Sequence, residues 1–322
     1  MRRRIVYGGV VLLLVAGFVL SLVTGKYPLT LTDLLSGDET SLQVFWNLRF
    51  ARSVMAMVAG FGLAMTGYVF QTVFQNPIAS PDIMGVSSGA CVGAGVAIVF
   101  LDAYSGATAL FAFFGGILAV MLSMTFARLS PESKLATFVL SGVAVNALAE
   151  ALLMLIKMTA DPLGKLAMLE FWTMGSFATV TAKDTYLTLP MVLLSSVGLL
   201  LMYRQITLLA LDGEDAKMLG VSVAKVRCIV IVLATLVVSI IVSNVGRISF
   251  IGLIAPHIMR LLTRTHSVGS MFFSGLLGGA IILFADSLAR SLGSAEIPIS
   301  ILTSLIGAPI LICLVLKGGK MS

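Results

Sequence analysis

Ionisable side chains inside apolar stretches are the first candidates for chemistry in this sequence. The clearest are two acids, Glu150 and Asp286. Asp286 precedes Arg290 by four residues, so both lie on one helix face and can neutralise each other. The apolar stretches carry no run of carboxylates or histidines, which a proton relay across a membrane needs. A structural ion pair and a functional one both stay open for Asp286.

Metal ligands and a phosphate-binding loop are the next candidates, and the sequence supports neither. The two histidines and three cysteines are isolated, without the paired spacing of a zinc site or a disulfide framework. No Gly-x-x-x-x-Gly-Lys-Ser/Thr loop occurs, so the chain cannot hold ATP by that chemistry. We predict no catalytic residue, no metal site and no cofactor in this chain.

The composition places most of the chain in lipid. Hydrophobic residues make up 58%, charged residues 11%, and the mean hydropathy is +1.06, whereas soluble proteins carry about 25% charged residues. A net charge of +6 suits nucleic acid in a soluble protein, but in a membrane protein basic residues mark cytoplasmic loops. We therefore expect this chain to lie in a lipid bilayer and to bind no nucleic acid.

Ten apolar stretches have about the length of a membrane-spanning helix, which needs roughly 17 to 25 residues. The third and eighth are the shortest or are interrupted by glycine. The predicted spans are Ile5–Val23, Val54–Phe74, Gly85–Leu101, Ala107–Ala127, Leu135–Ile156, Tyr186–Tyr203, Val226–Val245, Ile248–Leu262, Val268–Leu288 and Ile297–Leu316. The fold class is an all-α membrane protein of about ten helices.

The basic residues indicate the orientation. With the N-terminus inside, thirteen of the 21 Lys and Arg residues fall on the cytoplasmic side and eight outside. Cytoplasmic loops are the richer in Lys and Arg, so both termini are predicted to be cytoplasmic. The basic N-terminus and Ile5–Val23 also resemble a signal peptide, but the apolar run exceeds the usual ~7–15 residues, and we favour an uncleaved first helix.

Small residues recur at four-residue intervals within three spans. Such stripes let helix backbones approach closely, so we interpret them as packing surfaces. They are Gly85-x-x-x-Gly89-x-x-x-Gly93, Gly60-x-x-x-Ala64 and Gly275-x-x-x-Gly279.

Two connections carry distinctive signals. Between the second and third spans, Pro77 and Pro81 prevent a continuous helix, and Asn76 can bond the freed backbone groups; the prediction is a rigid turn. After the sixth span, residues 208–221 carry a short helix of their own, which Asp212 can cap and Gly220 can end.

The first of these connections resembles a known family. Residues 76–85 read Asn-Pro-Ile-Ala-Ser-Pro-Asp-Ile-Met-Gly, close to the Asn-Pro-Leu-Ala-x-Pro-x-x-Leu-Gly signature of FecCD/BtuC-type permeases of iron-siderophore, haem and vitamin B12 ABC importers. Further similar stretches follow the family order across nearly the whole chain, although Ala51 replaces a family proline. They are residues 49–52, 62–67, 208–221, 248–260, 285–290 and 296–309.

This resemblance implies a fold and a set of partners. Members have a BtuC-like, type II importer bundle of ten helices, here one polytopic domain over residues 1–322. The resemblance implies a second permease subunit, identical or paralogous, two ATPase subunits that hold ATP and Mg²⁺, and an extracytoplasmic substrate-binding protein. It also makes residues 208–221 a coupling helix for the ATPase, rather than a helix lying on lipid. The residues assigned to coupling are Asp212, Gly213, Glu214, Ala216, Leu219 and Gly220.

The resemblance assigns two further groups of residues. Arg49, Arg52 and Arg290 are expected at the outer side, where the family account is docking of the binding protein and the alternative is a solvated or Asp286-paired face. Asn76, Pro77 and Ile78 become candidates for the inner gate.

The function expected from this resemblance is import of a ferric siderophore, or of a haem- or cobalamin-type metal chelate, into the cytoplasm by alternating access. The location is the bacterial plasma (inner) membrane. The chain itself is a transport subunit and not an enzyme. An ion- or proton-coupled secondary transporter is the alternative, and which chelate is carried stays open.

Overall fold

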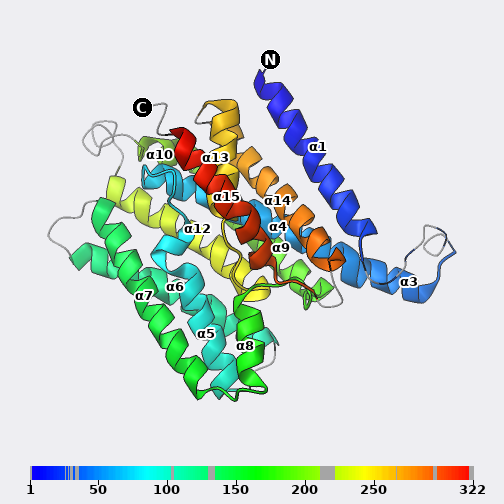
Figure 1. Cartoon of the computed structure of the whole chain (residues 1–322). Coiled ribbons are helices and arrows are strands. Elements are labelled where there is room, and N and C mark those ends of the chain that lie inside the picture. The colour runs from blue at the N-terminus through cyan, green and yellow to red at the C-terminus, as the bar shows by residue number, and fades with distance from the viewer. Residues whose placement is uncertain are drawn as a thin grey trace. The chain divides into compact units, whose positions relative to one another are not determined.

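The computed structural model describes residues 2–25, 27, 29, 32, 36–102, 105–129, 135–210, 222–265, 267–292 and 296–318. Every regular element in these ranges is a helix (Figure 1), which confirms the all-α prediction. Ten of the helices are long and apolar. They are α1 (Arg2–Val23), α4 (Ala51–Val73), α5 (Val86–Phe100), α6 (Ser105–Leu129), α7 (Leu135–Thr159), α9 (Ala182–Leu201), α12 (Val223–Val245), α13 (Ile251–Thr263), α14 (Val268–Ser291) and α15 (Ile299–Gly318).

Each predicted span overlaps one of these ten helices. Seven helical segments of the described chain are long and apolar enough to cross a membrane, and α5, α13 and the described part of α15 are shorter. Helices α5 and α13 contain 15 and 13 residues, in agreement with the short third and eighth spans. At about 1.5 Å per residue, α13 measures roughly 20 Å, less than a hydrocarbon layer of about 30 Å.

Short helices outside the spans were not predicted from the sequence. They are α3 (Glu39–Gln43), the π-helix η1 (Val44–Phe50), the 3₁₀-helix η2 (Pro81–Met84), α8 (Lys165–Thr173) and α10 (Tyr203–Leu208). Helix α8 shows why. Its Leu169 is fully buried in a cluster with Val99, Leu153 and Ile156, so tertiary packing rather than local pattern holds it in place.

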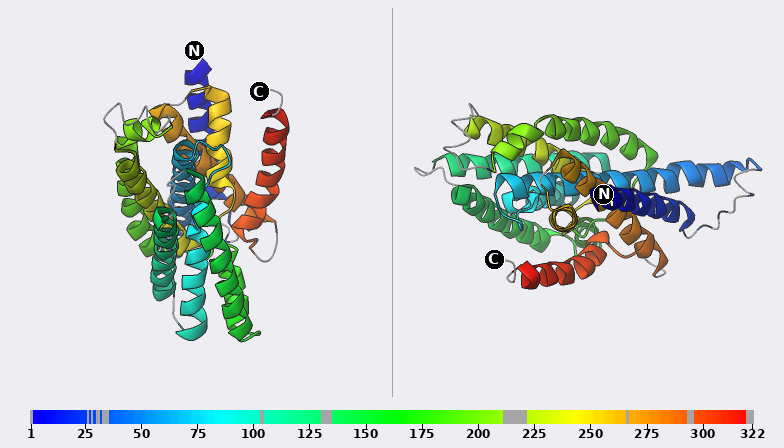
Figure 2. Two further views of the ribbon diagram at one scale, coloured as in Figure 1. Left: turned by 90° about the vertical axis from the view of Figure 1, so that its left-hand side faces the viewer. Right: turned by 90° about the horizontal axis from the view of Figure 1, so that it is seen from above.

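Contacts divide the chain into two compact units. The first comprises residues 1–65, 174–190 and 248–322, and the second comprises residues 66–173 and 191–247. Within the first, α14 packs against α1 and α13; within the second, α5 packs against α6 and α7, and α12 against α6 (Figures 1 and 2). Since α4 and α9 each belong to both units, this division does not test the prediction of one polytopic domain.

The small-residue stripes lie where helices approach most closely. In the first unit, a Cβ on Gly60 would clash with the backbone of Gly278, and one on Gly275 with the ring of Phe61. In the second unit, a Cβ on Gly93 would clash with the Phe111 carbonyl of α6. The interpretation of these stripes as packing surfaces is confirmed, except at Gly85. That glycine has a φ of 79° just before α5, and a Cβ there would make only ordinary contacts.

We expect Gly60→Ala to destabilise the protein, although alanine favours helix by up to ~1 kcal/mol. The new methyl group has no room beside Gly278, and overpacking costs about 1–3 kcal/mol. Gly8→Ala in α1 is the matched control, because a Cβ there meets nothing within 4 Å. Thermal unfolding of the purified permease in detergent should show a lower Tm for Gly60→Ala only; equal shifts would contradict the packing assignment.

Candidate functional site

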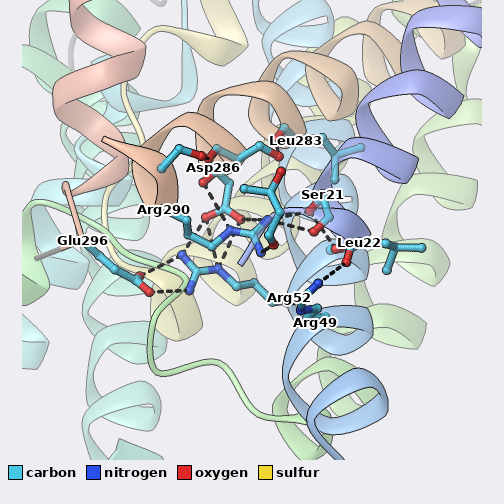
Figure 3. A network of polar contacts seen from close by, with 12 residues as sticks. Ser21, Leu22, Arg49, Arg52, Leu283, Asp286, Arg290 and Glu296 are labelled. Atoms are coloured by element: carbon cyan, nitrogen blue, oxygen red, sulfur yellow. Dashed lines mark hydrogen bonds and ion pairs between the residues drawn. The ribbon is translucent and has the colours of Figure 1, made fainter. Parts of the chain in front are cut away.

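A network of charged side chains occupies the first unit, with Arg52 of α4 at its centre (Figure 3). Arg52 Nη2 lies 2.8 Å from Asp286 Oδ1 and 2.9 Å from Glu296 Oε2. Arg52 Nε also donates to Asp286, and Nη1 donates to Glu296 Oε1 at 3.1 Å. Its guanidinium group is therefore shared by two carboxylates, each held by more than one hydrogen bond, the strongest geometry for this pair of groups.

Arg290 extends the network from α14 to the end of α1. Its Nη2 lies 3.1 Å from Asp286 Oδ2, which confirms the ion pair predicted from the four-residue spacing. The same side chain donates to Ser21 Oγ at 2.8 Å and to the Thr24 carbonyl at 2.8 Å. Asp286 thus accepts from two arginines, and Arg290 ties the last turn of α1 to α14.

Arg49, in the π-helix η1, bonds a different set of acceptors. It donates to the carbonyl oxygens of Leu22 and Val23 at 2.9 and 2.8 Å, and to that of Tyr27. The last carbonyls of a helix lack partners within it and carry partial negative charge that attracts a cation. Arg49 therefore caps the C-terminus of α1, which has no basic residue in its own last turn.

The burial of these arginines decides between the two forms of the alternative to docking, a solvated face and an Asp286-paired one. Arg49 and Arg290 are 6% and 7% exposed, and the Arg52 and Asp286 side chains are 11% and 1% exposed. A solvated face is therefore wrong, and pairing with Asp286 holds for Arg52 and Arg290. Glu296 is the most open member, at 24%. Docking of a binding protein at these arginines stays a prediction.

The turn after α4 contains the three gate candidates. Asn76 Oδ1 accepts a hydrogen bond from Ile78 N at 3.0 Å, and the Asn76 carbonyl accepts from Ala79 N at 3.0 Å. Helix α4 ends at Val73 and η2 begins at Pro81, so the predicted proline-containing turn is confirmed. Ile78 is 49% exposed, which leaves an apolar side chain open at this turn. The gate role of Asn76, Pro77 and Ile78 remains a prediction.

Gln75 links this turn to the first residues of the predicted coupling segment, 208–221, a contact the sequence did not reveal. Its Nε2 donates to the carbonyl oxygens of Ala210 and Leu209 at 3.1 and 3.5 Å. Gln75 has a φ of 49°, a left-handed conformation uncommon outside glycine. The six predicted coupling residues, Asp212, Gly213, Glu214, Ala216, Leu219 and Gly220, lie outside the described residues.

These features define a class of protein. Long apolar helices, a proline-broken turn and internally paired charges are typical of a polytopic membrane transporter. Among the residues that the structure describes, no three His, Cys, Asp or Glu side chains gather closely enough to hold a metal ion.

Comparison with known proteins identifies the family. A sequence profile of the FecCD transport family matches residues 13–317. The chain belongs to the FecCD transport family and is a permease of the type II ABC importer class. This assignment agrees with the resemblance found in the ordered motifs.

Two curated relatives and one solved structure cover nearly the whole chain. The Haemophilus influenzae molybdate import permease MolB is 38% identical over 98% of this chain and 96% of its own length. The Yersinia pestis haemin transport permease HmuU is 31% identical over the same shares. A metal-chelate type ABC transporter, solved in an inward-facing conformation, is 36% identical with a TM-score of 0.89, covering 97% of this chain and 99% of its own.

We expect the effects of Arg52→Gln and Asp286→Asn on stability to be coupled. Each single change leaves a buried charge with fewer partners, which destabilises a protein, whereas the double change removes both members of the pair. The double variant should lose less stability than the sum of the singles, with a coupling energy of about 0.5–3 kcal/mol.

Chemical unfolding in mixed micelles measures these free energies. Arg49→Gln combined with Asp286→Asn is the control, because Arg49 bonds the end of α1 instead of this carboxylate. Additive losses for Arg52 and Asp286 would contradict the network as the source of stability.

Proposed function

We propose that this chain is the permease subunit of an importer for a metal chelate, namely a ferric siderophore or a haem- or cobalamin-type compound. The observation that carries the proposal is the family match over residues 13–317, together with relatives named for haemin and cobalamin import. The relative named for molybdate import, 38% identical, favours an oxyanion as a second candidate cargo.

The proposed assembly contains this chain and a second permease subunit, identical or paralogous, in the bacterial plasma (inner) membrane. Two ATPase subunits would supply ATP hydrolysis, and an extracytoplasmic protein would deliver the cargo. We place both termini in the cytoplasm, on the basic-residue bias. ATP-driven movement of residues 208–221 would open the pathway alternately to each side. The Gln75 contacts to Leu209 and Ala210 support this mechanism, because they tie the segment to the gate turn.

Uptake by a strain lacking this permease tests the cargo and the coupling together. Cells complemented with the wild-type chain should regain uptake of one probe among a radiolabelled iron siderophore, haemin, cyanocobalamin and molybdate. Ala216→Trp should abolish that uptake, because a bulky side chain on the proposed coupling helix clashes with the ATPase cleft, whereas Ala216→Ser should retain it.

Membrane insertion of both variants is checked by immunoblot. Restored uptake of none of the four probes would refute the import proposal. Full uptake with Ala216→Trp would leave import intact and remove residue 216 from the coupling site.

We further propose that the binding protein docks where Arg49, Arg52 and Arg290 lie. In this proposal, an acidic side chain of the binding protein takes the place of Glu296 on Arg52. Glu296 fits this exchange because it is the most exposed acid of the network, whereas Asp286 is 1% exposed. Charge pairs at an interface rim mainly change association rate and salt dependence.

We therefore expect Glu296→Gln to strengthen docking a few-fold at low salt, since it removes the competing carboxylate and leaves Arg52 in place. An exposed charge pair contributes ~0.2–1 kcal/mol, and salt should screen the gain. The measurement is the Kd of the purified binding protein for the reconstituted transporter at low and high salt. Glu170→Gln is the control, because Glu170 forms an exposed pair with Lys157 at 3.0 Å. Equal affinities for the two variants would argue against docking at Arg52.

A further inference from the structure

A second charged cluster lies in the other unit, and it shares no residue with the arginine network, the gate turn or the coupling segment. Arg247 Nη1 lies 3.2 Å from Glu150 Oε1. Ser88 Oγ of α5 lies 3.0 Å from the same carboxylate oxygen and 2.6 Å from Asn146 Oδ1. Glu150 and Asn146 come from α7, and Arg247 follows the end of α12. Three helical elements thus bring one cation, one anion, a hydroxyl and an amide together.

The cluster lies at membrane depth. Glu150 is fifteen residues from the start of the 25-residue helix α7 and nine from its end, so it lies about 22 Å from one end and about 13 Å from the other at 1.5 Å per residue. Neither end of α7 is close to Glu150, so this side chain lies within a hydrocarbon layer of about 30 Å when the helix crosses it. Gly246, with a φ of 72°, ends α12 just before Arg247. The ion pair with Glu150 brings the Arg247 guanidinium to the depth of that carboxylate.

The charged groups are half-open, unlike those of the arginine network. The side chains of Arg247 and Glu150 are 37% and 33% exposed. Charged side chains at this depth face a bundle interior or a water-filled cavity, because contact with hydrocarbon is costly. The other flank of α7 differs, since Leu148 and Leu152 border an apolar groove of about 520 Å³ between α5, α6 and α7. Helix α7 therefore separates a polar flank from an apolar one.

We propose that Arg247 and Glu150 form a contact for anionic oxygen atoms on the water-filled lining of the translocation pathway. An incoming carboxylate, sulfonate or oxyanion group takes the place of Glu150 on the Arg247 guanidinium. The Ser88 hydroxyl, which is 2% exposed, bonds Asn146 and Glu150 from inside the bundle. Guanidinium groups suit such ligands because their planar N–H groups match paired oxygen atoms. The proposal extends the proposed import function by naming the chemical class that the pathway accepts.

The neighbouring carboxylate explains why this contact can pass an anion rather than retain it. A pathway needs binding strong enough for entry and weak enough for release. An arginine without an acid beside it would hold the anion, whereas Glu150 competes for the same donors and restores the resting pair once the cargo leaves. The pair is neutral at rest, which also reduces the cost of holding charge at this depth.

Thiol modification with two small reagents of opposite charge tests the proposal without knowledge of the cargo. In a chain whose three cysteines are replaced by alanine, Ala147→Cys places a thiol on the polar flank, three residues before Glu150. Leu148→Cys is the matched control on the apolar groove. The transporter is reconstituted in nanodiscs, and modification rates are measured with methanethiosulfonate ethylsulfonate, an anion, and its ethyltrimethylammonium analogue, a cation.

We expect the Ala147→Cys thiol to react with both reagents at least tenfold faster than the Leu148→Cys thiol. Arg247→Gln should lower the ratio of anion rate to cation rate at position 147 about five- to tenfold, and Glu150→Gln should raise it by a similar factor, as for one charge removed at about 7 Å in water. The double variant Glu150→Gln with Arg247→Gln should return the ratio to near its original value. The ratio cancels differences in access, so it isolates the local charge.

Two outcomes would overturn the proposal. One is a thiol at position 147 as unreactive as the thiol at position 148, which would place lipid or protein over this flank. The other is a ratio that neither single variant changes. If Arg247→Gln is not monodisperse on size exclusion, Arg247→Lys is used instead. It keeps the charge and should keep the ratio, while Glu150→Gln still tests whether the local charge sets the ratio. A permease that imports none of the four probes leaves these rates unaffected, so failure of the import function is distinguishable.

Discussion

In the hydrocarbon interior of a bilayer a polar group finds no water, so each one needs a partner inside the protein. In the arginine network, the guanidinium N–H groups of Arg52 donate to the carboxylates of Asp286 and Glu296. Arg49 meets this requirement at the end of α1 by bonding carbonyl groups that the helix leaves open. At the exposed turn after α4, the Asn76 side chain accepts the N–H group of Ile78, a bond local to the turn. Charged side chains and helix ends therefore form their hydrogen bonds with groups of neighbouring helices.

Local patterns revealed most of the fold from the sequence. The length of the apolar stretches indicated all ten long helices, and the short third and eighth spans were visible because their apolar runs are short. The glycine stripes were equally readable, since a four-residue interval places small residues on one helix face. Helix α8 was missed because Leu169 is held by residues of other helices. The π-helix before α4 had no signal in the pattern.

Some contacts of the candidate site could likewise be predicted from the sequence, and others could not. The Asp286–Arg290 pair is four residues apart and could be predicted. Arg52, by contrast, lies 234 positions from Asp286 and 244 from Glu296, and no periodicity links residues so far apart. Glu150 was recognised as an unusual acid, but its partner Arg247 is 97 positions away. Single-sequence reasoning can therefore mark a charge that needs a partner, whereas only the fold identifies that partner.

The two arginine clusters show how burial decides what a charge pair can do. Arg52 and Asp286 are 11% and 1% exposed, so separating them would leave a desolvated charge without compensation, which is strongly unfavourable. Such a pair does not readily exchange its partners, and it holds the two helices together. Arg247 and Glu150 expose about a third of their surface, so water can compensate each charge while a new partner arrives. The same chemical pair thus stabilises the helices in one place and is open to exchange in the other, and the difference follows from solvent access rather than residue type.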